Sequence, residues 1–221
     1  MARLARVVAP GLPHHVTQRG NRRQQTFFND SDYAAYRKFV AAGCAAAGVA
    51  VWGYCLMPNH VHLILVPSSE DGLRRALAEA HRRYSQRVNR REGWTGYLWQ
   101  GRFASAVMDD AHLMACARYV ELNPVRARLA ERAEDWPWSS ARAHLAGRDD
   151  GLAAVAPLLA GEPDWRAFLN QGLAPEEHRA LQRAERTGRP LGSDAFLARL
   201  EAALGRPLAK QKPGPKPKAD D

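Results

Sequence analysis

Two runs of β-branched and aromatic residues that meet at a two-residue turn constrain the fold of this chain more than any other feature. Residues 49–57 and 60–66 each have the length and composition of a strand. Pro58-Asn59, between them, is a turn signal. The two runs therefore predict an antiparallel β-hairpin in the first half of the chain.

Helix and strand signals surround this hairpin. A first strand is predicted at residues 14–19, ending at the turn signal Gly20-Asn21. A helix follows, capped within Asn29-Asp30-Ser31 and ended by Gly48. Its predicted buried face carries apolar and small residues at helical spacing: Tyr33, Tyr36, Phe39, Val40 and Gly43.

The pattern continues after the hairpin. Residues 71–90 predict a long helix with one apolar stripe, and residues 97–107 predict a fourth strand. Asp109-Asp110 then caps a helix that Pro124 must end. The order β-α-β-β-α-β-α predicts a ferredoxin-like α+β fold, in which one antiparallel sheet carries helices on one face.

The character of the sequence changes after residue 126, and we predict three parts. Residues 1–126 form the main domain and residues 127–206 a helical accessory region, which begins near Trp136-Pro137-Trp138-Ser139-Ser140 and includes helices at 176–186 and 193–204. Residues 207–221 are a basic, proline-rich tail that cannot pack a core, and we expect it to be a flexible arm.

The charge balance points to a polyanionic partner. There are 32 Lys and Arg residues against 23 Asp and Glu, a net charge of +9, which favours nucleic acid first and an anionic membrane second. A composition of 46% hydrophobic and 25% charged residues excludes wholesale disorder. Three scattered cysteines exclude a disulfide framework and indicate a reducing compartment.

One stretch has the length of a membrane span. Residues 39–57 contain no charged side chain, but Gly43, Gly48 and Gly53 favour a helix end, a turn and a strand. The N-terminus lacks the apolar core of a signal peptide. We therefore expect no membrane association, and a cytoplasmic location associated with the nucleoid.

The sharpest local signal is His60-Val61-His62 on the predicted second hairpin strand. Side chains two apart on a strand point to one face, so the two imidazoles project together and can hold a divalent metal. The alternative is a polar strand face that happens to carry two histidines.

Tyr119 and Asn123 form a second pair, one helical turn apart. A phenol is a nucleophile for phosphodiesters, and an amide oxygen one turn away can complete a metal shell. The alternative is a tyrosine at the edge of the core and an asparagine that caps the helix before Pro124.

Taken together, these motifs resemble a known family. The segments MPNHVHLI and ARYVELNPVRA are similar to those of the HUH single-tyrosine transposases, in the branch of REP-associated tyrosine transposases. Residues 98–103 and 136–140 also match. The resemblance covers residues 10–145 firmly and the remainder loosely.

The resemblance implies an enzyme that cuts and rejoins single-stranded DNA beside REP-like hairpins through a 5′-phosphotyrosine. Carried over to this chain, His60 and His62 bind the metal, Tyr119 is the nucleophile and Asn123 is the third ligand. Many relatives have Gln where this chain has Asn123. A metal would neutralise the phosphodiester as a Lewis acid. Mixed N and O ligands suit Mg²⁺ or Mn²⁺, and Cys55 is interpreted as a core residue.

Arginines are the expected DNA contacts. They are Arg19, Arg22, Arg23, Arg82, Arg83, Arg102 and Arg126. A solvated helix face is an equal alternative for those on residues 74–90. Four aromatic residues are either stacking partners for unpaired bases or core residues: Trp94, Tyr97, Trp99 and Trp138.

Three other functions remain open at this stage: a non-catalytic DNA-binding regulator on the same fold, a structural zinc protein, and a replication initiator or relaxase. The last normally needs longer accessory segments. A monomer and a homodimer are both compatible with the sequence.

Overall fold

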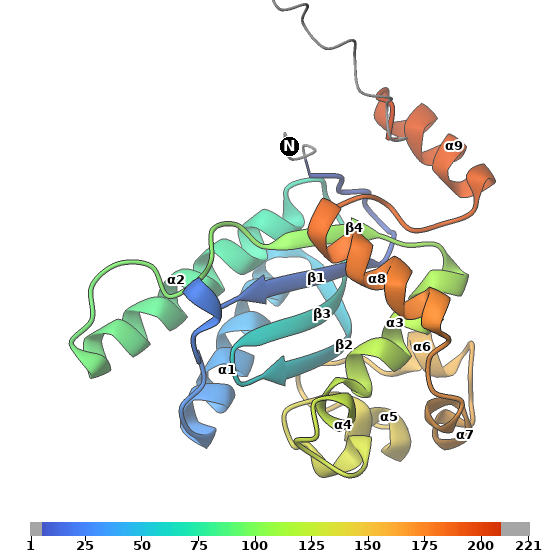
Figure 1. Cartoon of the computed structure of the whole chain (residues 1–221). Helices are drawn as coiled ribbons and strands as arrows, with labels where there is room; N and C mark the ends of the chain where they lie inside the picture. Colours follow the sequence, from blue (N-terminus) through green and yellow to red (C-terminus); the bar gives the residue numbers. More distant parts are fainter. Residues whose placement is uncertain (1–5, 209–221) are drawn as a thin grey trace, which may run out of the picture.

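The computed structural model describes residues 6–208 and places one four-stranded antiparallel sheet at the centre of the molecule (Figure 1). The strands are β1 (His14–Arg19), β2 (Val49–Met57), β3 (His60–Pro67) and β4 (Ala104–Val107), in the spatial order β2-β3-β1-β4. This is the order of a ferredoxin-like sheet, so the predicted fold class is confirmed. Of the predicted tail, residues 209–221 lie outside the described residues, whereas Leu208 is buried in a small apolar cluster with Phe196 and Leu200.

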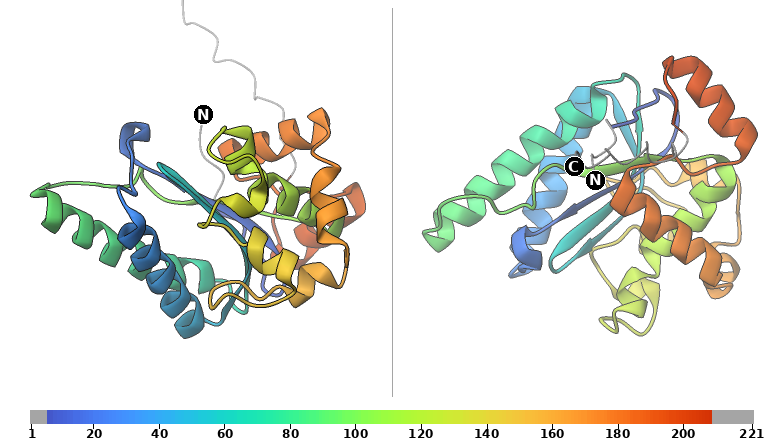
Figure 2. Two further views of the ribbon diagram at one scale, coloured as in Figure 1. Left: turned by 90° about the horizontal axis from the view of Figure 1, so that it is seen from below. Right: turned by 45° about the horizontal axis from the view of Figure 1, so that its top comes forward.

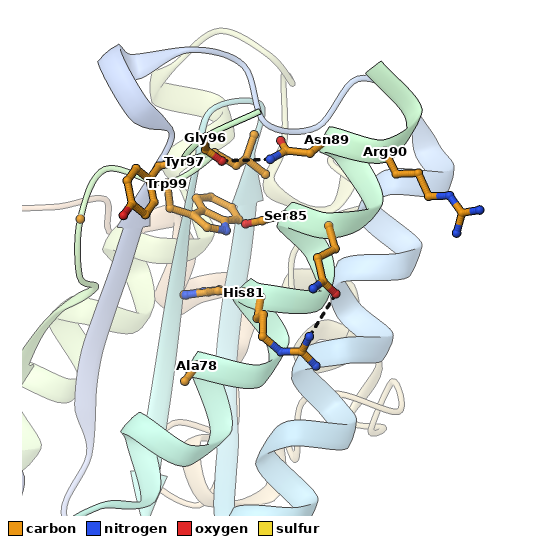
Figure 3. A pocket seen from close by; sticks show the side chains of 12 residues that line it. Ala78, His81, Ser85, Asn89, Arg90, Gly96, Tyr97 and Trp99 are labelled. Carbon is orange, nitrogen blue, oxygen red and sulfur yellow. Dashed lines mark hydrogen bonds between the residues drawn. The ribbon is translucent and has the colours of Figure 1, made fainter. Parts of the chain in front are cut away.

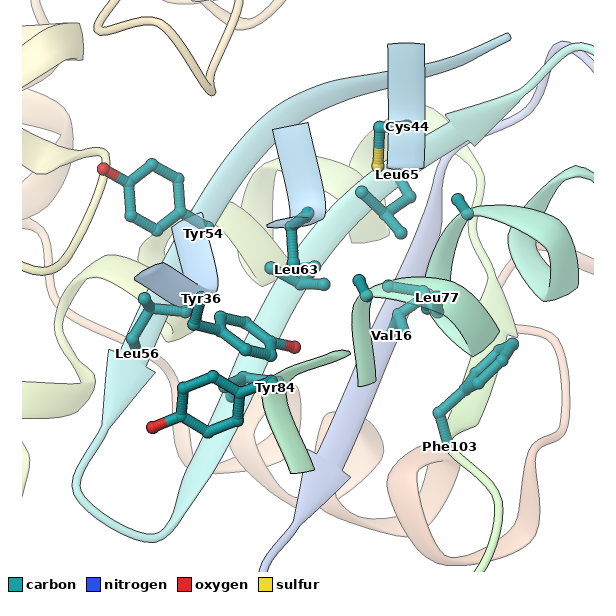
Figure 4. Close-up of a cluster of buried hydrophobic side chains, with 14 of the residues drawn as sticks. Val16, Tyr36, Cys44, Tyr54, Leu56, Leu63, Leu65, Leu77, Tyr84 and Phe103 are labelled. Atoms are coloured by element: carbon teal, nitrogen blue, oxygen red, sulfur yellow. The ribbon is translucent and has the colours of Figure 1, made fainter. Parts of the chain in front are cut away.

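Two long helices cover one face of the sheet. They are α1 (Asp30–Ala47) and α2 (Gly72–Glu92). Asn29 caps α1 by accepting a hydrogen bond from the Asp32 N–H, and Gly48 ends it in the left-handed conformation, as predicted. Gly43 lets the helices approach closely, because a Cβ there would lie 2.4 Å from the Ala76 carbonyl oxygen. Both helices bury their apolar stripes against Val61, Leu63 and Leu65 of β3 in the larger core cluster (Figure 4).

The second face of the sheet is covered as well, which corrects the prediction of helices on one face only. It carries α3 (Asp110–Glu121) and α8 (Pro175–Thr187), and the two faces are seen edge-on in Figure 2. Cys55 and Ile64 of the sheet share a second apolar cluster with Cys116 of α3, Trp165 and Leu181. The buried position of Cys55 confirms its interpretation as a core residue.

The predicted fourth strand is too long. Only Ala104–Val107 pairs with β1, and residues 97–103 form an irregular segment. Gly96 and Gly101, both with positive φ, interrupt the extended backbone. The segment still follows the end of β1, because Asn21 N–H donates to the Leu98 carbonyl and Gln100 N–H to the Arg19 carbonyl.

The remaining elements are short helices, apart from α9. They are η1 (Asn21–Arg23), α4 (Asn123–Arg126), η2 (Ala133–Asp135), α5 (Ala141–Ala146), α6 (Ala156–Leu159), α7 (Trp165–Asn170) and α9 (Asp194–Leu204). Residues 136–140, predicted to begin a helix, instead run along β2, where Leu56 N–H donates to the Trp138 carbonyl. The predicted helices at 176–186 and 193–204 are confirmed, the latter with its Ser193 cap. The division of the chain near residue 126 remains a prediction.

Candidate functional site

His60 and His62 project from the same face of β3, and their ring centroids are 4.9 Å apart. His62 is fully buried, whereas His60 is half-buried and borders a cavity. Burial lowers the pKa of His60 to about 3 and holds the pKa of His62 well below its usual value. Both rings are therefore neutral, which is the form of imidazole that binds metals.

The hydrogen bonds of the two rings leave one nitrogen of each available. Nδ1 of His60 bonds to Asn59 Oδ1 at 2.6 Å, and Nδ1 of His62 bonds to Nε2 of His15 at 3.0 Å. Nε2 of His62 is buried and has no hydrogen-bond partner among residues 6–208. Metal-binding histidines characteristically use one ring nitrogen for the metal and the other for an orienting hydrogen bond. The pair therefore fits a divalent cation held through the Nε2 atoms.

Tyr119 of α3 lies against the histidines from a separate element. Its ring centroid is 5.5 Å from that of His62 and 5.9 Å from that of His15. The guanidinium of Arg126 stacks over the phenol ring at 4.2 Å. Only 5% of Tyr119 is exposed, and burial, with the neighbouring Glu185 carboxylate, raises the pKa of the phenol. The hydroxyl is therefore protonated at neutral pH.

Helix α8 supplies groups that cover the phenol. The ring of His178 is 5.6 Å from that of Tyr119, and Oε1 of Glu185 lies 3.7 Å from Nδ1 of His62. The ligand atoms of His15, His62 and Glu185 all lie within 4.8 Å of one another, so this trio is a second set that fits a cation. Sequence reasoning missed His15 and Glu185 as site residues. The alternation of β1 placed His15 on a sheet face, but no local pattern marks Glu185.

Asn123 is 9% exposed and begins α4. Within residues 6–208, no hydrogen bond joins its side chain to His60 or His62. It does not cap α3 either, because Leu122 is the capping residue, so that alternative is wrong. Its predicted role as third ligand remains a prediction.

A cavity of about 560 Å³ opens beside His60, and we call it the histidine cavity. Arg19, Arg23 and Arg102 line it, as does Arg186 of α8. Glu185 is the single acidic residue among its described lining residues. Three of the predicted DNA-contacting arginines therefore gather at the mouth of the candidate metal site.

The other predicted arginines lie elsewhere. Arg22 is exposed on η1, and Arg126 packs on Tyr119. Arg82 is bound to Glu79 through two hydrogen bonds, and Arg83 stacks over the Phe39 ring at 4.5 Å. The structure thus brings four of the seven arginines to the histidine and tyrosine cluster.

The fold and the cluster of histidines around a tyrosine are those expected of a tyrosine transposase of the HUH type. The family model described as IS200-like transposase matches residues 10–123, slightly more than half of the chain. The chain therefore belongs to the IS200-like transposase family, which confirms the resemblance seen in the sequence.

Two known proteins are similar to this chain. A Haemophilus influenzae protein, provisionally assigned as a REP-associated tyrosine transposase, is 28% identical over 97 residues, covering 39% of this chain and 55% of that protein. The chain thus matches about half the length of this curated relative. A solved structure of a REP-associated tyrosine transposase bound to a REP hairpin is 20% identical, with a TM-score of 0.58 over 70% of this chain and 92% of that chain. At that identity the likeness shows a shared fold.

No helix among residues 6–208 combines the length and apolarity that crossing a membrane requires.

Proposed function

We propose that this protein is a metal-dependent enzyme that cuts and rejoins single-stranded DNA beside a hairpin, with Tyr119 as the nucleophile. The observation that carries the proposal is the position of the phenol, 5.5 Å from an imidazole whose Nε2 is buried without a partner. The arginine-lined histidine cavity, whose wall includes His60 and Glu185, offers a place for the DNA backbone.

His60 and His62 would hold the metal, Mg²⁺ or Mn²⁺, through their Nε2 atoms, with Asn123 as the expected oxygen ligand. Glu185, which faces Nδ1 of His62, would support the pair from the other side of the ring. A bound divalent cation supplies Lewis acidity that neutralises the non-bridging phosphate oxygens. The orienting bond from His15 fixes the ring of His62. Arg126 holds the phenol by stacking and by donating to the Tyr119 carbonyl at 3.1 Å.

In the reaction, the Tyr119 oxygen attacks phosphorus and the bond to the 3′ oxygen breaks. The product is a 5′-phosphotyrosine, and the leaving strand ends in a 3′-hydroxyl. Because the pKa of the phenol is raised, its proton must pass to a neighbouring group or to water during the attack. The covalent linkage conserves the energy of the phosphodiester, so the 3′-hydroxyl can reverse the step and rejoin strands.

The test is adduct formation with hairpin oligonucleotides that carry single-stranded flanks, in the presence of Mn²⁺ or Mg²⁺. We expect a denaturant-resistant adduct that retains a 3′ label and releases a 5′ label. Tyr119→Phe and excess chelator should each abolish the adduct, while Tyr119→Phe leaves hairpin binding largely intact. An adduct that persists in Tyr119→Phe would contradict the assignment of the nucleophile.

A non-catalytic DNA-binding regulator is the second candidate, and the burial of Tyr119 beneath α8 favours it. It predicts hairpin binding by the wild-type protein without any adduct, at every metal concentration. The same experiment therefore separates the two functions.

A further inference from the structure

A second cavity lies between α2 and residues 96–101, separate from the histidine cavity but next to it. Its volume is about 760 Å³, and we call it the α2 cavity (Figure 3). Successive turns of α2 form one wall of the cavity, which includes Ser85 and Asn89. Tyr97, Trp99 and Gly101 supply the opposite wall.

The two cavities share one segment of chain as a partition. Trp99 and Gly101 line the α2 cavity, whereas Gln100 and Arg102 line the histidine cavity. Hydrogen bonds from Asn21 N–H to the Leu98 carbonyl and from Gln100 N–H to the Arg19 carbonyl fix this segment to the end of β1. The amide of Asn89 holds the other end of the loop, donating to the Gly96 carbonyl at 2.9 Å. The α2 cavity is therefore a built feature adjacent to the candidate active site.

The side chain of Trp99 presents an unused donor in this cavity. The indole is 7% exposed, and its Nε1–H has no hydrogen-bond partner in the described part of the chain. Its ring is fixed by contacts with His81 and Tyr84, at centroid distances of 5.1 and 5.9 Å. A buried N–H normally finds an acceptor, because leaving it unpaired is costly. The indole thus lacks an acceptor that a ligand can supply.

An exposed aromatic ring stands beside this donor. Tyr97 is 88% exposed and lines the same cavity, and Figure 3 shows Trp99 between Tyr97 and Ser85. Arg90 also lines the cavity and has no acidic partner within residues 6–208. Each of these groups suits one part of a nucleotide. The ring of Tyr97 can stack on the face of a base, the N–H of Trp99 can donate to the edge of the base, and the guanidinium of Arg90 can pair with the phosphate.

We propose that the α2 cavity binds an unpaired nucleobase of the DNA strand, stacked on Tyr97 and accepting a hydrogen bond from Trp99 Nε1. The proposal rests on the proposed function and gives it a specific contact outside the histidine cavity. The volume is within the usual range of small-ligand pockets. A strand bound here reaches the histidine cavity across the partition, past Gln100.

The test measures binding without cleavage. Labelled hairpins with an unpaired thymidine flank, or with blunt ends, are titrated in chelator against variants made in a Tyr119→Phe background. Tyr97→Ala should weaken binding of the flanked hairpin by about fivefold or more and leave the blunt hairpin unchanged. Tyr97→Phe keeps the stacking face and serves as the matched control, so it should bind as tightly as the parent.

A second arm addresses the donor. Abasic substitutions are placed one at a time along the flank, and one position should weaken binding to the parent protein. In Trp99→Phe, which keeps an aromatic ring in the core, that position should lose most of its effect. Thermal unfolding of each variant confirms that it is folded.

The outcomes separate this inference from the proposed function. Equal binding of every oligonucleotide by Tyr97→Ala and Tyr97→Phe overturns the inference even if the wild-type protein forms an adduct. Tyr97-dependent binding of the flank supports it even if no adduct forms. If free thymidine monophosphate binds as tightly as the flanked hairpin, the occupant is a free nucleotide and the inference is wrong.

Discussion

At the scale of single residues, the two nitrogens of His62 face different surroundings. Nδ1 faces His15 and Glu185, whereas Nε2 is buried without a partner. The first arrangement orients the ring and the second leaves a lone pair for a cation. Asn123 is the oxygen ligand that the family resemblance predicts, and Glu185 is the carboxylate that contacts His62 in the structure.

We expect Glu185 to contribute to metal binding in the absence of DNA. Its carboxylate approaches His62 and is largely buried, so its negative charge acts on a nearby cation with little screening. Glu185→Gln should weaken Mn²⁺ binding about 10- to 100-fold in calorimetry, by analogy with the loss of groups that support metal ligands. Glu176→Gln, an exposed position on the same helix, is the control and should leave the affinity unchanged. The opposite result, in which Asn123→Ala weakens binding and Glu185→Gln does not, would assign the ligand to Asn123.

His14 gives a pH dependence of stability that does not involve the candidate metal site. Its ring is fully buried, Nδ1 bonds to the Leu12 carbonyl, and Nε2 accepts from the Ala9 N–H. Burial lowers the pKa from 6.5 to about 4. The unfolded chain therefore binds a proton at a higher pH than the folded chain does, and the free energy of unfolding decreases as the pH falls from about 6.5 towards 4.

The expected contribution of His14 is about 1.4 kcal/mol per pH unit within that window. His14→Gln removes the titrating group, so urea unfolding between pH 6.5 and 4.5 should show a slope smaller by this amount. Identical slopes for the two proteins would mean that His14 is protonated in the folded state.

At the scale of elements, α8 separates Tyr119 from the solvent. Helix α8 is held in place by an ion pair of 3.0 Å between its Glu177 and Arg118 of α3. Leu181, on the apolar face of α8, is buried. Because the phenol is only 5% exposed, we expect a phosphodiester to reach it only after a movement of α8. The rate of adduct formation should therefore depend on how tightly α8 is held.

Glu177→Gln should speed adduct formation about fivefold, since a partly buried ion pair of this kind contributes on the order of 1 kcal/mol. Single-turnover kinetics with a flanked hairpin would measure the effect. Glu176→Gln is again the control, because Arg179, on the solvent side of the helix, is the one ion-pair partner of Glu176 among residues 6–208. A slower reaction in Glu177→Gln would show that α8 assists the chemistry instead of covering it.

The sequence predicts elements well where local signals define their ends. The structure confirms this at three helix ends. The side chains of Asn29 and Asp109 cap the first turns of α1 and α3, and the left-handed backbone of Gly48 ends α1. The sequence also predicts that His60 and His62 project from one face, because the alternation of side chains along a strand is a local property. The fourth strand is shorter than predicted because Gly96, just before the predicted strand, and Gly101, within it, adopt positive φ and interrupt the extended backbone.

What the sequence could not predict depends on contacts between distant segments. Glu185 meets His62 across 123 positions of chain, and nothing near Glu185 marks it as a site residue. The same holds for Glu121, a buried carboxylate that accepts hydrogen bonds from Ser140, His144 and Trp165. These bonds join α3 to α5 and α7, so the second face of the sheet is built by partners that no periodicity reveals.

At the scale of the whole molecule, one group of arginines gathers where DNA is expected to lie. Arg19, Arg23, Arg102 and Arg186 line the histidine cavity, against one acidic residue among those described there. Single-stranded DNA that neutralises its phosphates on these groups releases counterions. The logarithm of the binding constant should therefore fall with the logarithm of salt concentration, by roughly 0.7 per phosphate contact.

Arg23 provides the sharpest test of this charge distribution, because it lines the cavity and has no acidic partner within residues 6–208. Arg23→Gln should weaken binding of a flanked hairpin and reduce the magnitude of the salt slope by about 0.7. Arg132→Gln removes an equal charge from an exposed arginine that is paired with Glu134, away from both cavities, and should leave the slope unchanged. If the two variants change the slope equally, the protein attracts DNA through its net charge alone. If only Arg23→Gln does so, the backbone passes through the histidine cavity, next to the imidazole pair and the phenol.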